Sequence, residues 1–202
     1  MVRIVRVTLI ALLAIGGTLA AGALAIAAPP PVTPGPAAPI TGIPVTATAV
    51  PIFITDVKCT PPSSDILTFT PPLSPVLQLT QVDKQTFYRP CSAPANPNLT
   101  SGTLSSSVTF NDMCPMVLQG GVVVQTVTWN TGQTTTMQLN RTASISGTTL
   151  IVKFTGTVIG GLFTGSQVTQ TYTASAVELI NCLNGTGVVP FIVSQVNLRI
   201  YH

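Results

Sequence analysis

Charged residues are scarce in this chain of 202 residues. Only 6% of them are Asp, Glu, Lys or Arg, against roughly 25% in an ordinary soluble protein. Two of the eight basic residues, Arg3 and Arg6, lie in an amino-terminal segment that we expect to be removed, which leaves six basic side chains against five acidic ones. Such a chain has no basic surface with which to neutralise phosphates. We therefore expect no nucleic-acid partner.

Histidine is almost absent as well. The only one is His202, the last residue, whereas Ser-His-Asp and Cys-His mechanisms need an imidazole held in a rigid site. With one histidine and no CxxC spacing among the cysteines, a zinc site is not expected. No run of aspartates matches a calcium loop, and no glycine-rich loop stands between a strand and a helix. We expect neither a metal ion nor a cofactor.

Acidic residues number only five, and they are spread along the chain. Two carboxylates are enough for glycoside hydrolysis, so a small extracellular hydrolase stays open as a third interpretation. Acids in strand proteins are usually turn or surface residues, and Asp112, in FNDMC, is placed to close a hairpin through an Asx turn. We expect no enzymatic activity and no catalytic residues. The five acids are Asp56, Asp65, Asp83, Asp112 and Glu178.

The amino terminus has the pattern of a signal peptide. Arg3 and Arg6 precede an uncharged apolar run over residues 7–28, in which small residues alternate near the end. We predict cleavage after Ala27, because Pro29 would hinder a cut after Ala28. The alternative is an uncleaved membrane anchor, since the run is just long enough to span a bilayer.

The predicted organisation has three parts: a signal peptide over 1–27, a leader over 28–51 and one β domain over 52–202. The leader is rich in Pro, Ala and Thr and carries no charge. Proline lacks an N–H, so we expect this segment to stay extended and solvated, either as a spacer or as a remnant of processing. The remaining part, about 150 residues, is a usual size for a single domain.

The domain contains four cysteines, an even number that predicts two disulfides in an exported chain. Of the three possible pairings, we predict Cys59–Cys91 and Cys114–Cys182. The first would staple a segment interrupted by prolines. The second would tie the start of the regular sheet to its end, and a strand expected over 102–111 separates the two pairs.

Period-two alternation of apolar and polar residues predicts antiparallel strands. Val196, Leu198 and Ile200 share one face of the last strand, and Pro190 must lie at an edge, a bulge or the start of that strand. No segment has a sustained helical period. Before Cys114 the pattern predicts shorter strands over 66–70, 76–81 and 85–89. The same alternation occurs at Met137, Leu139, Val152, Phe154 and Val158. The fold is therefore an all-β sandwich or barrel, and the sequence does not choose between them.

Trp129 is the single tryptophan and stands directly before an Asn-Thr-Gly turn. Its position in the run gives it the same face as Val123, Gln125 and Val127, which predicts a core residue at one end of the sheet. The alternative is a ring that stacks on a sugar, with Tyr172 as a second contact.

Several motifs occur in a recognisable order: YRPC ending at Cys91, WNTGQT from Trp129, GTVIGGLFTG from Gly156, and NCLNGTGV around Cys182. In these motifs the chain resembles an uncharacterised family of small secreted actinobacterial β-rich proteins with four cysteines. The resemblance implies secretion and a β fold, and it implies no activity.

The sequence predicts a secreted, non-enzymatic β protein with a structural or adhesive role at the cell envelope or outside the cell. The alternative is a module that binds carbohydrate or a cell-wall polymer. Its partners would be cell-wall polysaccharide or another envelope protein. We expect no association with a membrane once the signal peptide is cleaved.

Overall fold

The computed structural model describes residues 53–202 as ten strands with two short helices. The predicted signal peptide and leader lie outside the described residues. The elements are β1 (Thr55–Cys59), β2 (Ser64–Leu73), β3 (Gln78–Tyr88), β4 (Cys91–Ser92), β5 (Gly102–Asp112), η1 (Cys114–Leu118), β6 (Gly121–Trp129), β7 (Thr134–Ser146), β8 (Thr149–Gly161), β9 (Gln167–Ser175), α1 (Val177–Leu183) and β10 (Val189–Tyr201).

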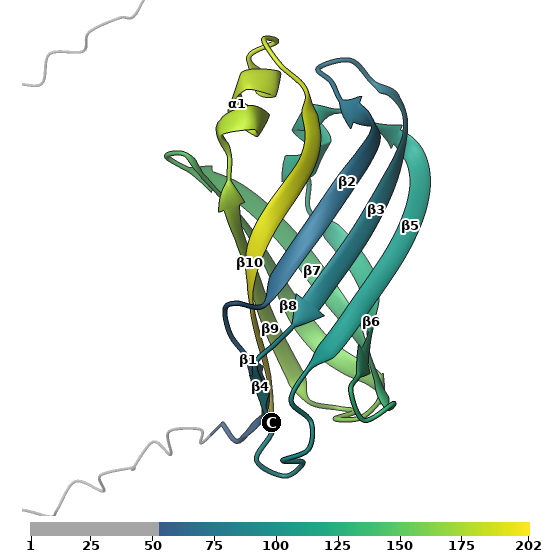
Figure 1. Cartoon of the computed structure of the whole chain (residues 1–202), viewed down its shortest axis with the longest axis vertical. Coiled ribbons are helices and arrows are strands. Elements are labelled where there is room, and N and C mark those ends of the chain that lie inside the picture. The colour runs from purple at the N-terminus through teal and green to yellow at the C-terminus, as the bar shows by residue number, and fades with distance from the viewer. Residues whose placement is uncertain (1–52) are drawn as a thin grey trace, which may run out of the picture. The chain divides into compact units, whose positions relative to one another are not determined.

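Eight of the strands form a closed antiparallel barrel, in the order β2-β3-β5-β6-β7-β8-β9-β10. The barrel closes because the first half of β10 pairs with β2, from Val189 to Gln195, while its other edge pairs with β9. The second half of β10 pairs instead with β1, to which the short β4 is added. Figure 1 shows α1 at one end of the barrel and β1, β4 and the carboxyl terminus at the other. The sandwich-or-barrel alternative is thus resolved in favour of the barrel.

The barrel interior follows the predicted alternation. Val196, Leu198 and Ile200 are buried, as are Met137 and Leu139 on β7. Because successive side chains of a strand point to opposite faces, every second residue of β7 and of β10 points into the barrel. The predicted alternating strands of the carboxy-terminal part are confirmed.

Two predictions about local structure are wrong. Instead of two short strands over 76–81 and 85–89, β3 runs unbroken from Gln78 to Tyr88, because the charged residues in its middle continue the alternation. The short helices η1 and α1 were not predicted, since five and seven residues are too few to show a helical period. Among residues 53–202, no helix has both the length and the apolar character needed to cross a bilayer.

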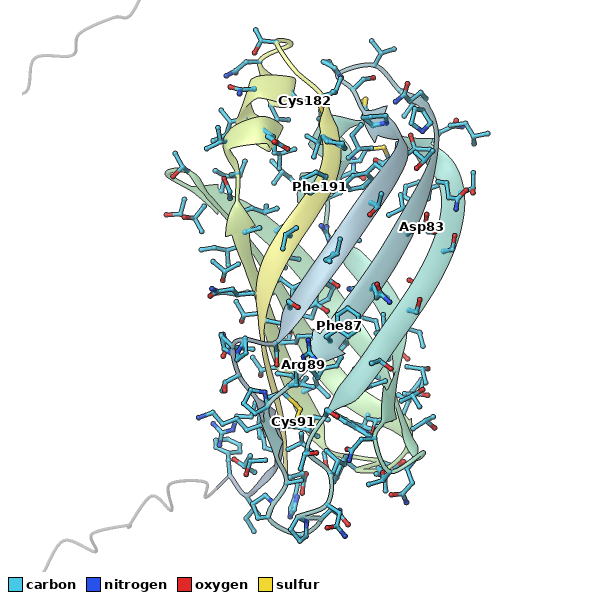
Figure 2. The ribbon with its side chains drawn as sticks, viewed as in Figure 1. Asp83, Phe87, Arg89, Cys91, Cys182 and Phe191 are labelled. Atoms are coloured by element: carbon cyan, nitrogen blue, oxygen red, sulfur yellow. A yellow bond between two sulfur atoms is a disulfide. The ribbon has the colours of Figure 1, made fainter. Side chains whose placement is uncertain are left out.

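Both predicted disulfides are confirmed. Cys59–Cys91 joins β1 to β4, and Cys114–Cys182 joins η1 to α1. They lie at opposite ends of the barrel (Figure 2). Each closes a long loop, of 32 and 68 residues, and by chain entropy each stabilises the fold by about 4 kcal/mol.

Pro190 lies where the sequence requires it. The pairing of β10 with β2 shifts between Val189 and Phe191, so Pro190 occupies an irregularity at the start of the strand. There its missing N–H removes no regular hydrogen bond from the ladder.

Candidate functional site: a cleft between β5 and β6

The barrel wall opens between two neighbouring strands, β5 and β6. They pair only through Gly102 with Trp129 and Thr103 with Thr128. By contrast, β5 pairs with β3 along its whole length, and β6 pairs with β7 from Gly121 to Thr128. From Leu104 to the end of β5, therefore, the edge that faces β6 has no strand partner.

Each end of this opening is fixed by a specific contact. At one end the ring of Trp129 packs against Gly102 so closely that a Cβ there would lie 2.6 Å from Cε3 of the ring. At the other end η1 links the two strands, and the disulfide to Cys182 anchors it. The Arg141 guanidinium also donates hydrogen bonds to the carbonyl oxygens of Val117, at 2.6 Å, and of Gln119. The two strands thus pair at one end of the opening and are linked through η1 at the other.

A cavity of about 520 Å³ lies behind the opening. We call it the β5–β6 cleft. Its apolar lining includes Leu67, Leu104, Val108, Val123, Val152 and Phe154, and its polar lining includes Lys84, Gln125, Arg141, Tyr172 and Ser194. Ligand pockets typically have volumes of roughly 300–1,000 Å³ and mostly apolar walls. The size and lining of the cleft are therefore those of a small-molecule site.

The strand register places this lining on the inner face of the barrel. Val108 is directly opposite Val82, and Ser106 is opposite Lys84; residues so paired point to the same side of a sheet. Val82 is buried, yet Val108 is 52% exposed and Phe110, further along β5, is 42% exposed. Apolar side chains that belong to the barrel interior are thus open to solvent through the cleft.

An ion pair lies in the polar part of the interior. The Lys84 ammonium is 3.8 Å from Oδ1 of Asp65, whose side chain is fully buried. Thr86 donates a hydrogen bond of 2.5 Å to the same oxygen. The ammonium also lies 4.6 Å from the ring centroid of Tyr172 and 5.4 Å from that of Phe154. Lys84 thus stands between two aromatic rings and a carboxylate.

Burial acts on both members of this pair. It raises the pKa of Asp65 above its ordinary value, although the Lys84 charge and the Thr86 hydrogen bond oppose it. It lowers the pKa of Lys84, and here the Asp65 charge opposes it. Because desolvation disfavours the charged forms of both groups, the free-energy difference between the ion pair and the neutral acid–amine pair is smaller than it is in water.

Three more polar side chains lie next to this pair. Gln170 Nε2 donates to the hydroxyl oxygens of Tyr88, at 2.6 Å, and of Tyr172, at 2.8 Å. Burial raises the pKa of Tyr88 to about 12 and that of Tyr172 well above its usual value, so both hydroxyls stay protonated. Within the described residues, three buried acceptor atoms have no hydrogen-bond partner: Asp65 Oδ2, Gln125 Oε1 and Gln170 Oε1. Of these side chains, Gln125 borders the cleft directly.

The two aromatic residues singled out by the sequence both face the interior. Trp129 is 2% exposed, as the core interpretation predicts, and its Nε1 donates a 2.7 Å hydrogen bond to Thr135 Oγ1. Tyr172 is also buried, and its ring borders the cleft. Neither ring lies on the outer surface of the barrel.

Asp112, for which the sequence predicts an Asx turn, ends β5 beside the cleft. Its Oδ1 accepts a 2.8 Å hydrogen bond from the backbone N–H of Met113, so it holds the chain where the strand ends. Burial raises the pKa of Asp112, and the Met113 hydrogen bond and the Arg141 charge oppose this shift. Across residues 53–202, no three His, Cys, Asp or Glu side chains are grouped so as to hold a metal ion.

Three polar residues of the cleft were not predicted from the sequence: Lys84, Gln125 and Arg141. For Lys84 a signal exists, because in QLTQVDKQTFY it is in phase with Val82 and Tyr88, both of which are buried. A lysine in phase with core residues points into the barrel. Only the register of β2 with β3, which places Asp65 opposite Thr86, shows that Asp65 lies next to Lys84.

In comparisons with known proteins, no family model, no curated protein and no solved structure matches this chain. The resemblance to small secreted actinobacterial proteins stays a prediction. The fold and the site together define an eight-stranded antiparallel barrel with a side cleft that leads to a buried ion pair. The cleft is therefore the candidate functional site of this barrel.

Proposed function

We propose that the protein is an exported binding protein that holds a small, mainly apolar molecule inside its barrel and admits it through the β5–β6 cleft. The carrying observation is the solvent-exposed apolar surface on the inner face of β5, at Val108 and Phe110. An eight-stranded barrel has an interior just wide enough to be filled by side chains or to hold one small ligand. Here the gap in the wall gives such a ligand a way in.

The lining favours an apolar body with one polar group. Most of the wall is aliphatic or aromatic, and burying such surface contributes roughly 25 cal/mol per Å². Lys84 and Tyr172 lie side by side in this lining and would orient the ligand by its polar end.

Export is supported by two independent features. The amino-terminal pattern predicts a signal peptide, and the two disulfides are typical of proteins outside the reducing cytosol. The absence of enzymatic activity remains part of this proposal. The structural or adhesive role predicted from the sequence, and carbohydrate binding, are its alternatives; the apolar lining favours neither.

Titration with N-phenyl-1-naphthylamine, a neutral probe that fluoresces in apolar surroundings, tests the proposal. Wild type should bind it saturably. Val108→Trp fills the cleft and should weaken binding by about tenfold or more, equivalent to about 1.4 kcal/mol. Val193→Trp is the matched control, because Val193 is also 52% exposed but lies on the outer face of β10.

Two results would count against apolar ligand binding. One is the absence of saturable binding by wild type. The other is an equal effect of the two tryptophan variants. Retention on cell-wall polysaccharide by a protein that ignores the probe would favour the carbohydrate-binding alternative.

A further inference from the structure

We infer that Lys84 is a covalent attachment site for an apolar aldehyde, which it binds as a Schiff base inside the β5–β6 cleft. This inference rests on the proposed function, because the aldehyde must enter the same cleft. It goes further in naming the reactive group of the ligand and the residue that captures it.

Lys84 differs from the other lysines of the chain in its surroundings. The chain has three lysines, Lys58, Lys84 and Lys153, and the other two are exposed. The Lys84 side chain is only 13% exposed and borders the cleft between the rings of Tyr172 and Phe154. Within the described residues its ammonium donates no hydrogen bond, since Asp65 is 3.8 Å away. Lys84 therefore offers a ligand its nitrogen in an apolar setting.

The position of Asp65 decides which ligand group fits. A ligand carboxylate at Lys84 would come close to a buried carboxylate, and like charges at short range in an apolar interior repel strongly. A carbonyl oxygen carries no charge and accepts a hydrogen bond from the ammonium without this penalty. The aliphatic wall formed by Leu67, Val123 and neighbouring residues would hold the carbon chain of the ligand.

The same pair supplies the proton transfers that a Schiff base requires. The Lys84 ammonium passes a proton to Asp65, and the neutral amine attacks the carbonyl carbon, so that a C–N bond forms and the oxygen takes the proton lost by nitrogen. Asp65 then protonates the hydroxyl of this carbinolamine, water leaves, and the nitrogen lone pair forms the C=N bond. The products are an iminium ion, one water molecule and the Asp65 carboxylate, which stays as the counter-ion. No oxidant or reductant takes part.

Burial supports the first of these steps, because it lowers the pKa of Lys84 and raises that of Asp65. A lysine desolvated in an apolar pocket is a more available nucleophile than one on the surface. Lys58 and Lys153 have no such environment and serve as internal controls.

Reductive trapping tests the inference. The full exported protein is incubated with octanal and sodium cyanoborohydride, which reduces imines, and is then digested and mapped by mass spectrometry. The octyl adduct should form on Lys84 about tenfold or more faster than on Lys58 or Lys153, because the cleft holds the aldehyde next to one amine only. An excess of 1-octanol, which has the same chain but no carbonyl, should suppress labelling of Lys84 alone. Lys84→Arg should remove the fast adduct and Lys153→Arg should keep it.

The outcomes separate the inference from the proposed function. If 1-octanol displaces N-phenyl-1-naphthylamine but octanal labels the three lysines equally, or none of them, the inference is wrong and the binding function stands. If neither 1-octanol nor the probe binds, the binding function itself fails. Should Lys84→Arg not fold, the wild-type map with and without 1-octanol decides the question by itself.

Discussion

At Gly102 the barrel wall closes because β5 carries no side chain where the ring of Trp129 lies. A methyl group there would lie 2.6 Å from Trp129 Cε3 and 2.8 Å from Val127 Cγ1. Both neighbours are fully packed, so neither has room to move. Gly102 thus allows β5 to pair with β6 at this end of the opening.

Gly102→Ala should therefore destabilise the protein by about 1–3 kcal/mol, the usual cost of overpacking a core. Gly121→Ala is the matched control on β6, where an added Cβ meets nothing within 4 Å. Urea denaturation of both variants measures the difference. Equal stabilities for the two would show that the Trp129 contact does not constrain β5.

The Asp65–Lys84 pair affects stability in opposite directions at the two ends of the pH scale. Asp65 has a folded-state pKa above 3.8, so the stability given by its protonated form is lost as pH rises through that pKa. Lys84 has a folded-state pKa below 10.5, so stability is gained as pH rises from that pKa toward 10.5. At pH values between these two ranges both groups are charged, and their desolvation lowers the stability of the folded protein.

We expect the pH dependence of stability to change when both groups are removed. The unfolding free energy of wild type minus that of Asp65→Asn/Lys84→Met should fall from acid to neutral pH and rise again in the alkaline range. Urea denaturation at a series of pH values measures this difference. A difference that grows from acid to neutral pH would contradict the raised pKa of Asp65, and a difference that falls in the alkaline range would contradict the lowered pKa of Lys84.

At the scale of the strand, the unusual element is β5. Over most of its length it forms backbone hydrogen bonds with β3 but none with β6. In an antiparallel pair, the hydrogen bonds of successive residues alternate between the two edges. Every second amide of β5 beyond Leu104 therefore points toward the cleft, away from β3. An edge of this kind is ordinarily covered or charged, whereas this one is lined by Val108 and Phe110.

Amide hydrogen exchange should detect the unpaired edge of β5. Alternate amides over residues 104–112 should exchange much faster than those of β8, which pairs with β7 and β9 along nearly its whole length. Amide exchange followed by NMR gives the rates one residue at a time. Uniform protection along β5 would mean that the wall is closed in solution.

The strands differ in how well their structure could be predicted from the sequence. Val196, Leu198 and Ile200 alternate clearly because each apolar side chain enters a core and each polar one faces water. In β3 the same rule holds, but Lys84 takes a core position and interrupts the apolar pattern, so the sequence predicts two short strands where the structure has one. The cleft itself was not predictable, because it depends on β5 and β6 failing to pair. Beyond Thr103 and Thr128 the two strands no longer pair, and no local sequence pattern indicates this.

At the scale of the molecule, the two disulfides hold the ends of the barrel, and the opening lies in the wall between those ends. Cys59–Cys91 secures the end that carries β1 and β4, and Cys114–Cys182 secures the end that carries α1 and η1 (Figure 2). The predicted pairing was correct because each bridge joins segments that lack long strands of their own. With both ends fixed, the wall between β5 and β6 can stay open without loss of the fold.

The central claim is that a small apolar molecule enters the barrel between β5 and β6, and methyl NMR during a titration with 1-octanol tests it most directly. Methyl signals from the cleft should shift saturably, namely those of Leu104, Val108, Val123 and Val152. The methyls of Val193, exposed on the outer face of β10, should not move. Shifts confined to outer-face methyls, or no saturable shift at all, would contradict the account.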